Sequence, residues 1–307
     1  MKYKHLLLIA AVCVTMFTGC STQQDTADVP AKQEVVDHIS AKKFADFGGC
    51  ASLKMPGNLA TAAATDSSYE KAENITSFYG TSEQAWKRLL DGKQDVIFAY
   101  EPSDEIKKQL EEQKICWQKV GTDALVMLAG GTTQSPTLTK EQIVSAYSDK
   151  KNAWTGYSSV SGSDSRILFE NLCANGDSSV ILGESVMENG AALTACCPHT
   201  PGTLCYTTYL SIHEHGQPMN TTMVAVNGVL PSEQTLTSVN TDTKPAYSFQ
   251  VPYYIACRGD LKINDSAKVF YDWMTSEEGM KWLYQATLAY PTTDMLEMST
   301  SSETNAN

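Results

Sequence analysis

Apolar and polar positions in the middle of the chain follow two different periods. The segment 95–100 is a nearly continuous apolar run, which is typical of a buried parallel strand. Just before it, the segment 85–90 carries apolar residues at helical spacing, and Gly92 offers a stop. The residues Thr81-Ser82-Glu83-Gln84 fit a capping box. The pattern therefore predicts a helix that begins near Thr81 and is followed by a buried strand.

The same two periods recur along the chain. They predict further strands at 124–129, 223–229 and 247–256. They also predict helices from Ser103 to about Lys114, from Thr139 through Tyr147, over 165–173, and after Thr275-Ser276-Glu277-Glu278. Because strands and helices alternate, the sequence predicts an α/β protein with mostly parallel sheets.

The N-terminus has the pattern of an export signal. Two lysines precede an apolar run of twelve residues, 6–17, whereas a transmembrane helix needs about 20. The run ends in Thr18-Gly19-Cys20, and small residues before a cysteine are typical of a bacterial lipoprotein cleavage site. We expect residues 1–19 to be removed and Cys20 to carry a lipid on the extracytoplasmic face of the cell membrane. The alternative is plain secretion. Residues 20–35 suit a tether and residues 299–307 a disordered tail.

Length and composition limit the function. The chain has 307 residues, which is length for two ordinary domains, and its 42% hydrophobic content is globular. The net charge of −12 argues against nucleic acid as a partner, because phosphates would be repelled. It does not argue against one small anion in a pocket, where local donors outweigh distant charge.

Cysteines outside the leader predict disulfides. Seven remain, and in an exported protein they pair more often than they act as catalytic thiols. We expect at least two disulfides, with the cluster Cys196, Cys197 and Cys205 contributing to at least one. A metal or redox site at this cluster is an alternative, although an adjacent pair chelates one ion poorly. No Ser/His/Asp order, P-loop or zincin motif is found, so we predict neither an enzyme nor a cofactor.

From about Thr76 to Tyr290, local patterns occur in an order that resembles a known family. They are the segment from Thr81 to Ser103, the segments 123–126 and 138–154, the segment 226–235 with Val226-Asn227-Gly228-Val229, and 272–279 with Asp272-Trp273-Met274. Together they resemble the phosphate-binding proteins of bacterial ABC transporters, which are type II periplasmic binding proteins.

The resemblance implies two α/β lobes joined by two crossing strands, with the ligand between the lobes. Lobe one would comprise 36–124 plus 250–298 and lobe two 125–249, with crossings near Asp123-Ala124 and Phe249-Gln250. It also implies a monomer that captures a small anion, phosphate by default, and passes it to a membrane permease. The alternative is a diverged member that serves as a surface sensor or adhesion module, with another ligand or none.

In lobe two the family places a Ser-Gly-Thr/Ser turn at a helix start, with an arginine four residues before it. Here the turn is either Ser161-Gly162-Ser163 or Ser163-Asp164-Ser165, and neither register has the arginine. Arg166 is the nearby guanidinium that could compensate, and Asp164 would repel an anion if it faced the cleft. The candidate ligands are Ser161, Gly162, Ser163, Ser165 and Arg166; the alternative is an ordinary loop with a helix cap.

In lobe one the resemblance implies an acidic residue at the end of the strand 95–100. Glu101 can accept the proton of monohydrogen phosphate, and a fully ionised oxyanion would be rejected. Ser103 could donate a hydrogen bond, or only cap a helix, and Glu101 could be a solvated turn residue. For the anion loop, the nearest candidate is 56–61, with Asn58 and Thr61. We expect the turn 161–165 to face 101–103 across the lobes.

Overall fold

The computed structural model describes residues 39–148, 153–181, 184–186, 200–237, 245–262 and 265–288. The export signal, Cys20, the tether, Cys196, Cys197 and the tail lie outside these residues. None of the described helices is long and apolar enough to cross a membrane.

Nine of the described strands form one sheet in the order β2-β1-β3-β11-β4-β8-β6-β7, with β9 paired to β4. Their bounds are β1 Phe47–Gly49, β2 Ser77–Phe78, β3 Val96–Tyr100, β4 Cys116–Gly130, β6 Thr155–Ser159, β7 Glu184–Val186, β8 Thr203–Thr208, β9 Thr221–Met223 and β11 Gln250–Cys257. A separate parallel pair joins β5 (Thr137–Leu138) to β10 (Ala225–Val226).

The strands β4 and β11 link two halves of this sheet. The start of β4 pairs with β11 as far as Ala124, and from Leu125 onward β4 pairs with β8. We call β1, β2 and β3 the first half and β6, β7 and β8 the second half, each with the helices that pack on it. All antiparallel pairings of the described strands involve β4 or β11, and the others are parallel. The predicted crossings lie where β4 changes partner and β11 begins; the lobe boundaries themselves stay a prediction.

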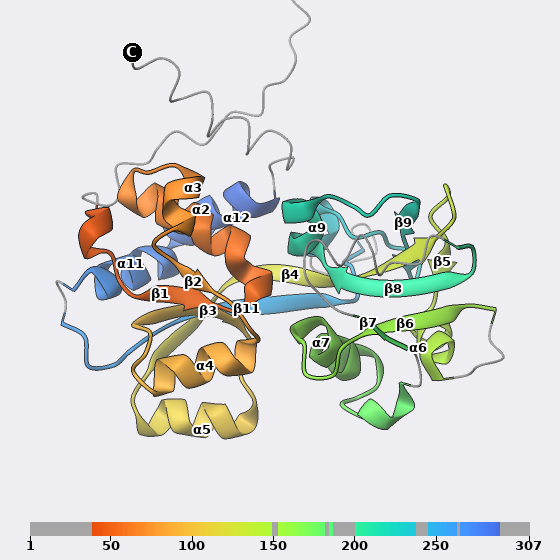
Figure 1. Cartoon of the computed structure of the whole chain (residues 1–307), viewed down its shortest axis with the longest axis horizontal. Coiled ribbons are helices and arrows are strands. Elements are labelled where there is room, and N and C mark those ends of the chain that lie inside the picture. The colour runs from red at the N-terminus through yellow and green to blue at the C-terminus, as the bar shows by residue number, and fades with distance from the viewer. Residues whose placement is uncertain are drawn as a thin grey trace, which may run out of the picture. The chain divides into compact units, whose positions relative to one another are not determined.

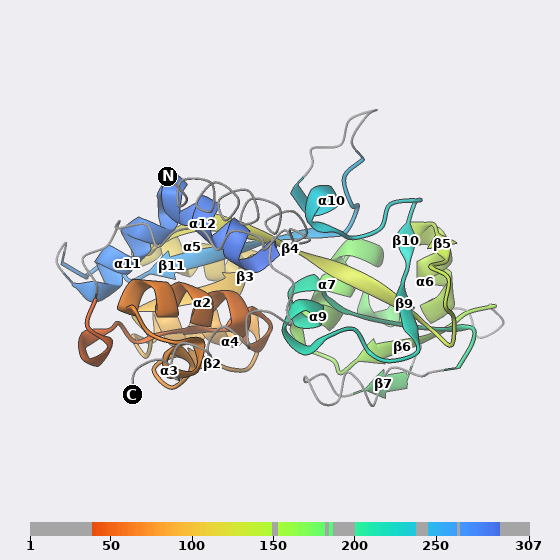
Figure 2. The same ribbon diagram turned by 90° about the horizontal axis from the view of Figure 1, so that it is seen from above.

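Helices cover both faces of the first half (Figure 1). Helices α4 and α5 lie on one face, and α2, α11 and α12 lie on the other. The second half carries α6, α7 and α9, and Figure 2 shows β4 and β11 running between the halves. The bounds are α2 Lys54–Thr65, α3 Tyr69–Glu73, α4 Ser82–Leu90, α5 Asp104–Glu112, α6 Lys140–Ser148, α7 Asp164–Cys173, α9 Tyr209–His215, α10 Glu233–Thr237, α11 Ser266–Thr275 and α12 Glu277–Leu288.

The predicted helix starts follow from side-chain capping. Thr81 accepts from the Gln84 N–H while the Gln84 side chain accepts from the Thr81 N–H, so both bonds of the capping box are present. Thr139 and Gln142 make the same reciprocal pair at α6. Each box satisfies N–H groups that have no partner in the helix. The predicted starts of α4 and α6 are therefore confirmed.

Two predicted strands have different limits in the structure. The strand predicted over 124–129 is the end of the fifteen-residue β4. The run 223–229 is not one strand, because Asn227 and Gly228 have φ of +51° and +84° and reverse the chain. Val226 and Val229 form a bridge on either side of this pair. An Asn-Gly pair with positive φ at both residues is the preferred two-residue hairpin turn.

Candidate functional site

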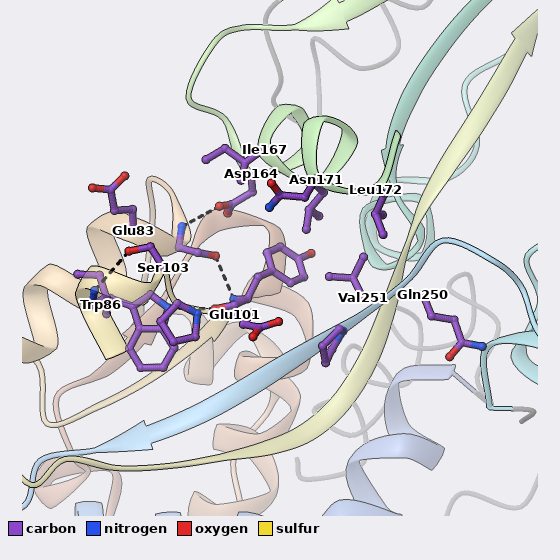
Figure 3. Close-up of a pocket in the computed structure, with 16 residues that line it drawn as sticks. Glu83, Trp86, Glu101, Ser103, Asp164, Ile167, Asn171, Leu172, Gln250 and Val251 are labelled. Carbon is purple, nitrogen blue, oxygen red and sulfur yellow. Dashed lines mark hydrogen bonds between the residues drawn. The ribbon is translucent and has the colours of Figure 1, made fainter. Parts of the chain in front are cut away.

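A cavity of about 250 Å³ lies where the two halves of the sheet meet (Figure 3). The first half contributes the start of α4, the end of β3 and the start of α5, and the second half contributes one side of α7. The strand β11 closes the cavity beside them. Its lining residues are Ser82, Glu83, Trp86, Tyr100, Glu101, Pro102, Ser103, Ile106, Asp164, Ile167, Leu168, Asn171, Leu172, Gln250, Val251 and Pro252.

On the first half, Glu101 and Ser103 both line the cavity, as the sequence proposes. Ser103 caps α5, because its hydroxyl accepts from the Ile106 N–H at 3.3 Å. A Glu101 carboxylate oxygen accepts from the Lys107 ammonium at 2.9 Å. Lys107 itself is not among the residues that line the cavity. No lysine or arginine is among the described residues that line the cavity.

On the second half, the serine-rich turn precedes α7. Ser161 and Gly162 are exposed, and Gly162 has a φ of +84°, which favours glycine. Ser163 is the cap of α7: its hydroxyl accepts from the Arg166 N–H and donates to the Val160 carbonyl. None of these three residues lines the cavity. The residue of this turn that enters it is Asp164.

The Asp164 side chain reaches across to the first half. Its Oδ1 accepts from the backbone N–H of Ser82, the first residue of α4, at 2.8 Å. Only 6% of Asp164 is exposed. Burial raises the pKa of the Asp164 carboxyl, and hydrogen bonds from the Ser82 N–H, the Cys50 thiol and the Ser82 hydroxyl act in the opposite direction. The position that an anion would take at the start of α4 is therefore filled by a carboxylate of the chain itself.

Cys50 follows β1 and stands close to this carboxylate. It is fully buried, and burial, followed by the nearby Asp164, raises the pKa of its thiol well above the ordinary value. The thiol therefore stays protonated and acts as a donor. Sequence reasoning counted Cys50 only among possible disulfides. Its position directly after a buried strand and before a helix was the available signal for a site residue.

Arg166 does not take the role proposed for a compensating guanidinium. Its Nε donates to a Glu170 carboxylate oxygen at 2.6 Å, and only 9% of its side chain is exposed. The four-residue spacing of this pair is that of neighbours on one helix face. Ser165 is fully buried and shares a hydrogen bond of 2.8 Å with Ser159. Neither Arg166 nor Ser165 lines the cavity.

Thr61 and Asn58 lie inside α2 rather than in an anion loop. Thr61 is fully buried, and its hydroxyl donates to the Gly57 carbonyl one turn back. The Asn58 side-chain oxygen accepts from the Thr76 hydroxyl. Gly57 is required for packing: a Cβ there would lie 1.9 Å from the Phe78 ring. The structure thus does not bring Thr61 to the cavity with Glu101 and Ser103.

Beneath the cavity, Asp123 ties both halves together. One of its oxygens accepts from the Tyr100 hydroxyl at 2.6 Å. The other accepts from the N–H groups of Ala124 and Leu210, at 2.7 and 3.0 Å. Burial raises the pKa of Asp123 to about 6 despite these bonds. The network joins the end of β3, the middle of β4 and the start of α9.

Most of the described cysteines are free. Cys50, Cys116, Cys173 and Cys257 are free thiols, and Cys205 is disulfide-bonded. Four of the seven cysteines outside the leader are therefore unpaired. The remaining three can form at most one disulfide with one another, so the predicted minimum of two is wrong. Cys50, Cys173 and Cys257 are buried, and Cys257 is the Cα partner of the exposed Cys116 in the β11–β4 pairing. Among the described residues, no group of three His, Cys, Asp or Glu side chains could hold a metal ion.

Comparison with known proteins identifies the family. Residues 48–278 match the model of the PBP superfamily domain. The match covers more than half of the chain, so the chain belongs to the superfamily of periplasmic binding protein (PBP) domains. A sequence comparison with curated proteins finds no significant match.

Solved structures share the fold. A phosphate-bound protein from Clostridium perfringens, assigned as a phosphate ABC transporter substrate-binding protein, matches with a TM-score of 0.60 and 15% identity, over 79% of this chain and 97% of that one. An ABC-type phosphate transport receptor from Vibrio cholerae matches with a TM-score of 0.56 and 14% identity, over 78% and 97%. A periplasmic protein assigned to metal binding matches with a TM-score of 0.55 and 13% identity, over 82% and 93%. The predicted type II periplasmic binding protein fold is confirmed.

Proposed function

We propose that this protein is an extracytoplasmic solute-binding protein that captures a small oxyanion, with phosphate as the reference solute, for an ABC transporter. The observation that carries this proposal is that the start of α4 already holds a carboxylate, the side chain of Asp164. The Ser82 N–H holds a carboxylate oxygen of Asp164 at 2.8 Å. A free N–H at a helix start, helped by the helix dipole, suits a small oxyanion. The role is binding, and we assign no reaction to it.

The lining of the cavity argues for a protonated oxyanion. Besides Asp164, the cavity is lined by the carboxylates of Glu83 and Glu101, and no described lining residue carries a positive charge. A carboxylate can accept a hydrogen bond from a protonated oxyanion, but it repels one that has no proton. We therefore expect phosphate to bind better than sulfate, and more weakly than it would with a bidentate arginine.

Replacing Glu101 with glutamine tests this selectivity. The change keeps the size of the side chain and removes the negative charge that repels sulfate. The affinity for sulfate should therefore rise relative to the affinity for phosphate. We expect the ratio of the phosphate to the sulfate affinity to fall by about tenfold, the scale of one hydrogen bond to a charged group. Calorimetric titration with both anions measures it. Glu105→Gln is the matched control, because Glu105 is an exposed acid in the first turn of α5 outside the cavity. A ratio that Glu101→Gln leaves unchanged would contradict the proposal.

Membrane anchoring by Cys20 is part of the proposal, because a lipid-anchored receptor stays close to its permease. Cys20→Ala should release the protein from membranes or block its maturation, since Cys20 is the cysteine that follows the predicted cleavage site and would carry the lipid. Membrane fractionation and mass spectrometry of the N-terminal peptide measure it. A Cys20→Ala protein that fractionates like the wild type, with no lipid on the wild-type cysteine, would refute the anchor.

A diverged sensor or adhesion module is the second candidate. It is favoured by one observation: the donors at the start of α4 are already occupied by Asp164. A member that no longer binds a solute could keep its halves joined in this way permanently.

A further inference from the structure

The contact between Asp164 and α4 resembles that of a bound anion, because a carboxylate of one half faces hydrogen-bond donors of the other half. The carboxylate belongs to the second half, and its donors belong to the first half. Ser82 and Asp164 are 82 residues apart in the sequence. The hydrogen bond that joins them is donated by the Ser82 N–H at 2.8 Å. The Ser82 hydroxyl oxygen accepts from the Tyr100 N–H at 3.0 Å, and both this hydroxyl and the Cys50 thiol are close enough to the Asp164 carboxyl to lower its pKa.

Contacts within the first half also hold these donors in place. Thr81 and Gln84 fix the start of α4 through the capping box. The hydroxyl of Ser82 is bound to β3 through Tyr100, and the Cys50 N–H donates to the Phe98 carbonyl of the same strand. Figure 3 shows Asp164 directed from α7 toward the first half, beside Glu83 of α4. A rigid set of donors in one half, filled by a side chain of the other half, is a preformed site with an occupant tethered to the chain.

We propose that Asp164 is a tethered oxyanion that occupies the solute's donors on α4 and holds the two halves together until a solute displaces it. The competition with solute rests on the proposed function, whereas the latch between the halves does not. A tethered group competes at a high effective concentration, in the millimolar range for flexible links. A solute therefore binds with an affinity reduced by the small fraction of molecules in which Asp164 has left.

The consequence is a threshold for binding. A solute that makes only the contacts of Asp164 gains nothing by replacing it. It must add contacts to the rest of the cavity, for example to Ser103 or to the Asn171 amide. Asp164 thereby sets both the affinity and the selectivity of the site, although it is not itself a ligand of the solute.

The test compares Asp164→Ala with Asp104→Asn. Asp104 is the matched control, because it too is the first residue of a helix behind a serine cap, and its side chain is 94% exposed. Hydrogen exchange at the Ser82 amide, measured without solute, reports on the hydrogen bond between Ser82 and Asp164. Calorimetry with inorganic phosphate measures the affinity that the competition by Asp164 should lower. Asp164→Asn serves if the alanine variant does not fold, because it keeps the size of the side chain and removes the charge.

We expect Asp164→Ala to speed exchange at Ser82 by at least about tenfold and to tighten phosphate binding by about tenfold, while Asp104→Asn changes neither. If exchange at Ser82 speeds up but neither protein binds phosphate or sulfate, the latch stands and the proposed function fails. Unchanged exchange at Ser82 overturns the latch. A wild-type protein that binds phosphate as tightly as Asp164→Ala does would overturn the competition between Asp164 and the solute.

Discussion

Replacing Phe47 with alanine is expected to lower the free energy of unfolding by about 3–5 kcal/mol, the usual cost of truncating a buried phenylalanine. Phe47 has no exposed surface and is the first residue of β1. Its ring packs on four others, with centroid distances of 4.8 Å to Phe270, 5.1 Å to Phe98, 5.2 Å to Phe78 and 6.3 Å to Phe44. The variant loses the burial of the ring and these contacts, and it leaves a cavity among rigid neighbours.

Urea unfolding at constant slope measures the loss. Met219→Ala is the control, because Met219 is 73% exposed and its truncation should change the free energy of unfolding by less than about 0.5 kcal/mol. A loss below about 1 kcal/mol in Phe47→Ala would mean that these rings do not form the core of the first half. The effect matters for the site because β1 leads directly into Cys50.

Replacing Asp123 with asparagine is expected to remove the contribution that this carboxyl makes to the pH dependence of the free energy of unfolding. The pKa of Asp123 is about 6 in the folded protein, against an ordinary value of 3.8. Between these values the folded state binds more protons than the unfolded chain, so its stability falls as pH rises from about 4 to about 6. The contribution of Asp123 to this fall is about 3 kcal/mol, at 1.36 kcal/mol per pKa unit.

Asparagine fits the same position. Its carbonyl oxygen can accept from the Ala124 and Leu210 N–H groups, and its amide can donate to the Tyr100 hydroxyl oxygen. Urea unfolding of both proteins at pH 4 and pH 7 isolates the effect, because other titrating groups are common to both. The stability of Asp123→Asn relative to the wild type should rise by about 2 kcal/mol between the two pH values, because part of the change lies below pH 4. A difference that does not change with pH would contradict the assignment.

Local chemistry made much of the fold readable from the sequence. The capping boxes at Thr81 and Thr139 rest on residues three apart, and the apolar run of β3 is complete within six residues. The error at α2 has a specific cause. Pro56 and Gly57 suggest a turn, but proline is tolerated in the first turn of a helix, and Gly57 is needed because the Phe78 ring lies against it.

Only part of the site could be predicted from the sequence. Glu101 and Ser103 follow a recognisable strand, and the structure puts both in the cavity. The partner of Asp164 is an N–H group 82 residues away, and no local pattern encodes that distance. The ion pair of Arg166 with Glu170 could have been foreseen from its four-residue spacing, and it removes the guanidinium that the sequence offered for an anion.

Calorimetric titration of the purified protein, first stripped of bound solute, with phosphate and with sulfate shows whether the chain binds a small oxyanion. We expect saturable phosphate binding with one site per chain and weaker binding of sulfate, because of the carboxylates at the cavity. If phosphate gives no heat at millimolar concentration, and gives none with Asp164→Ala either, the solute-binding claim for phosphate is contradicted, and the family and fold assignment alone stands.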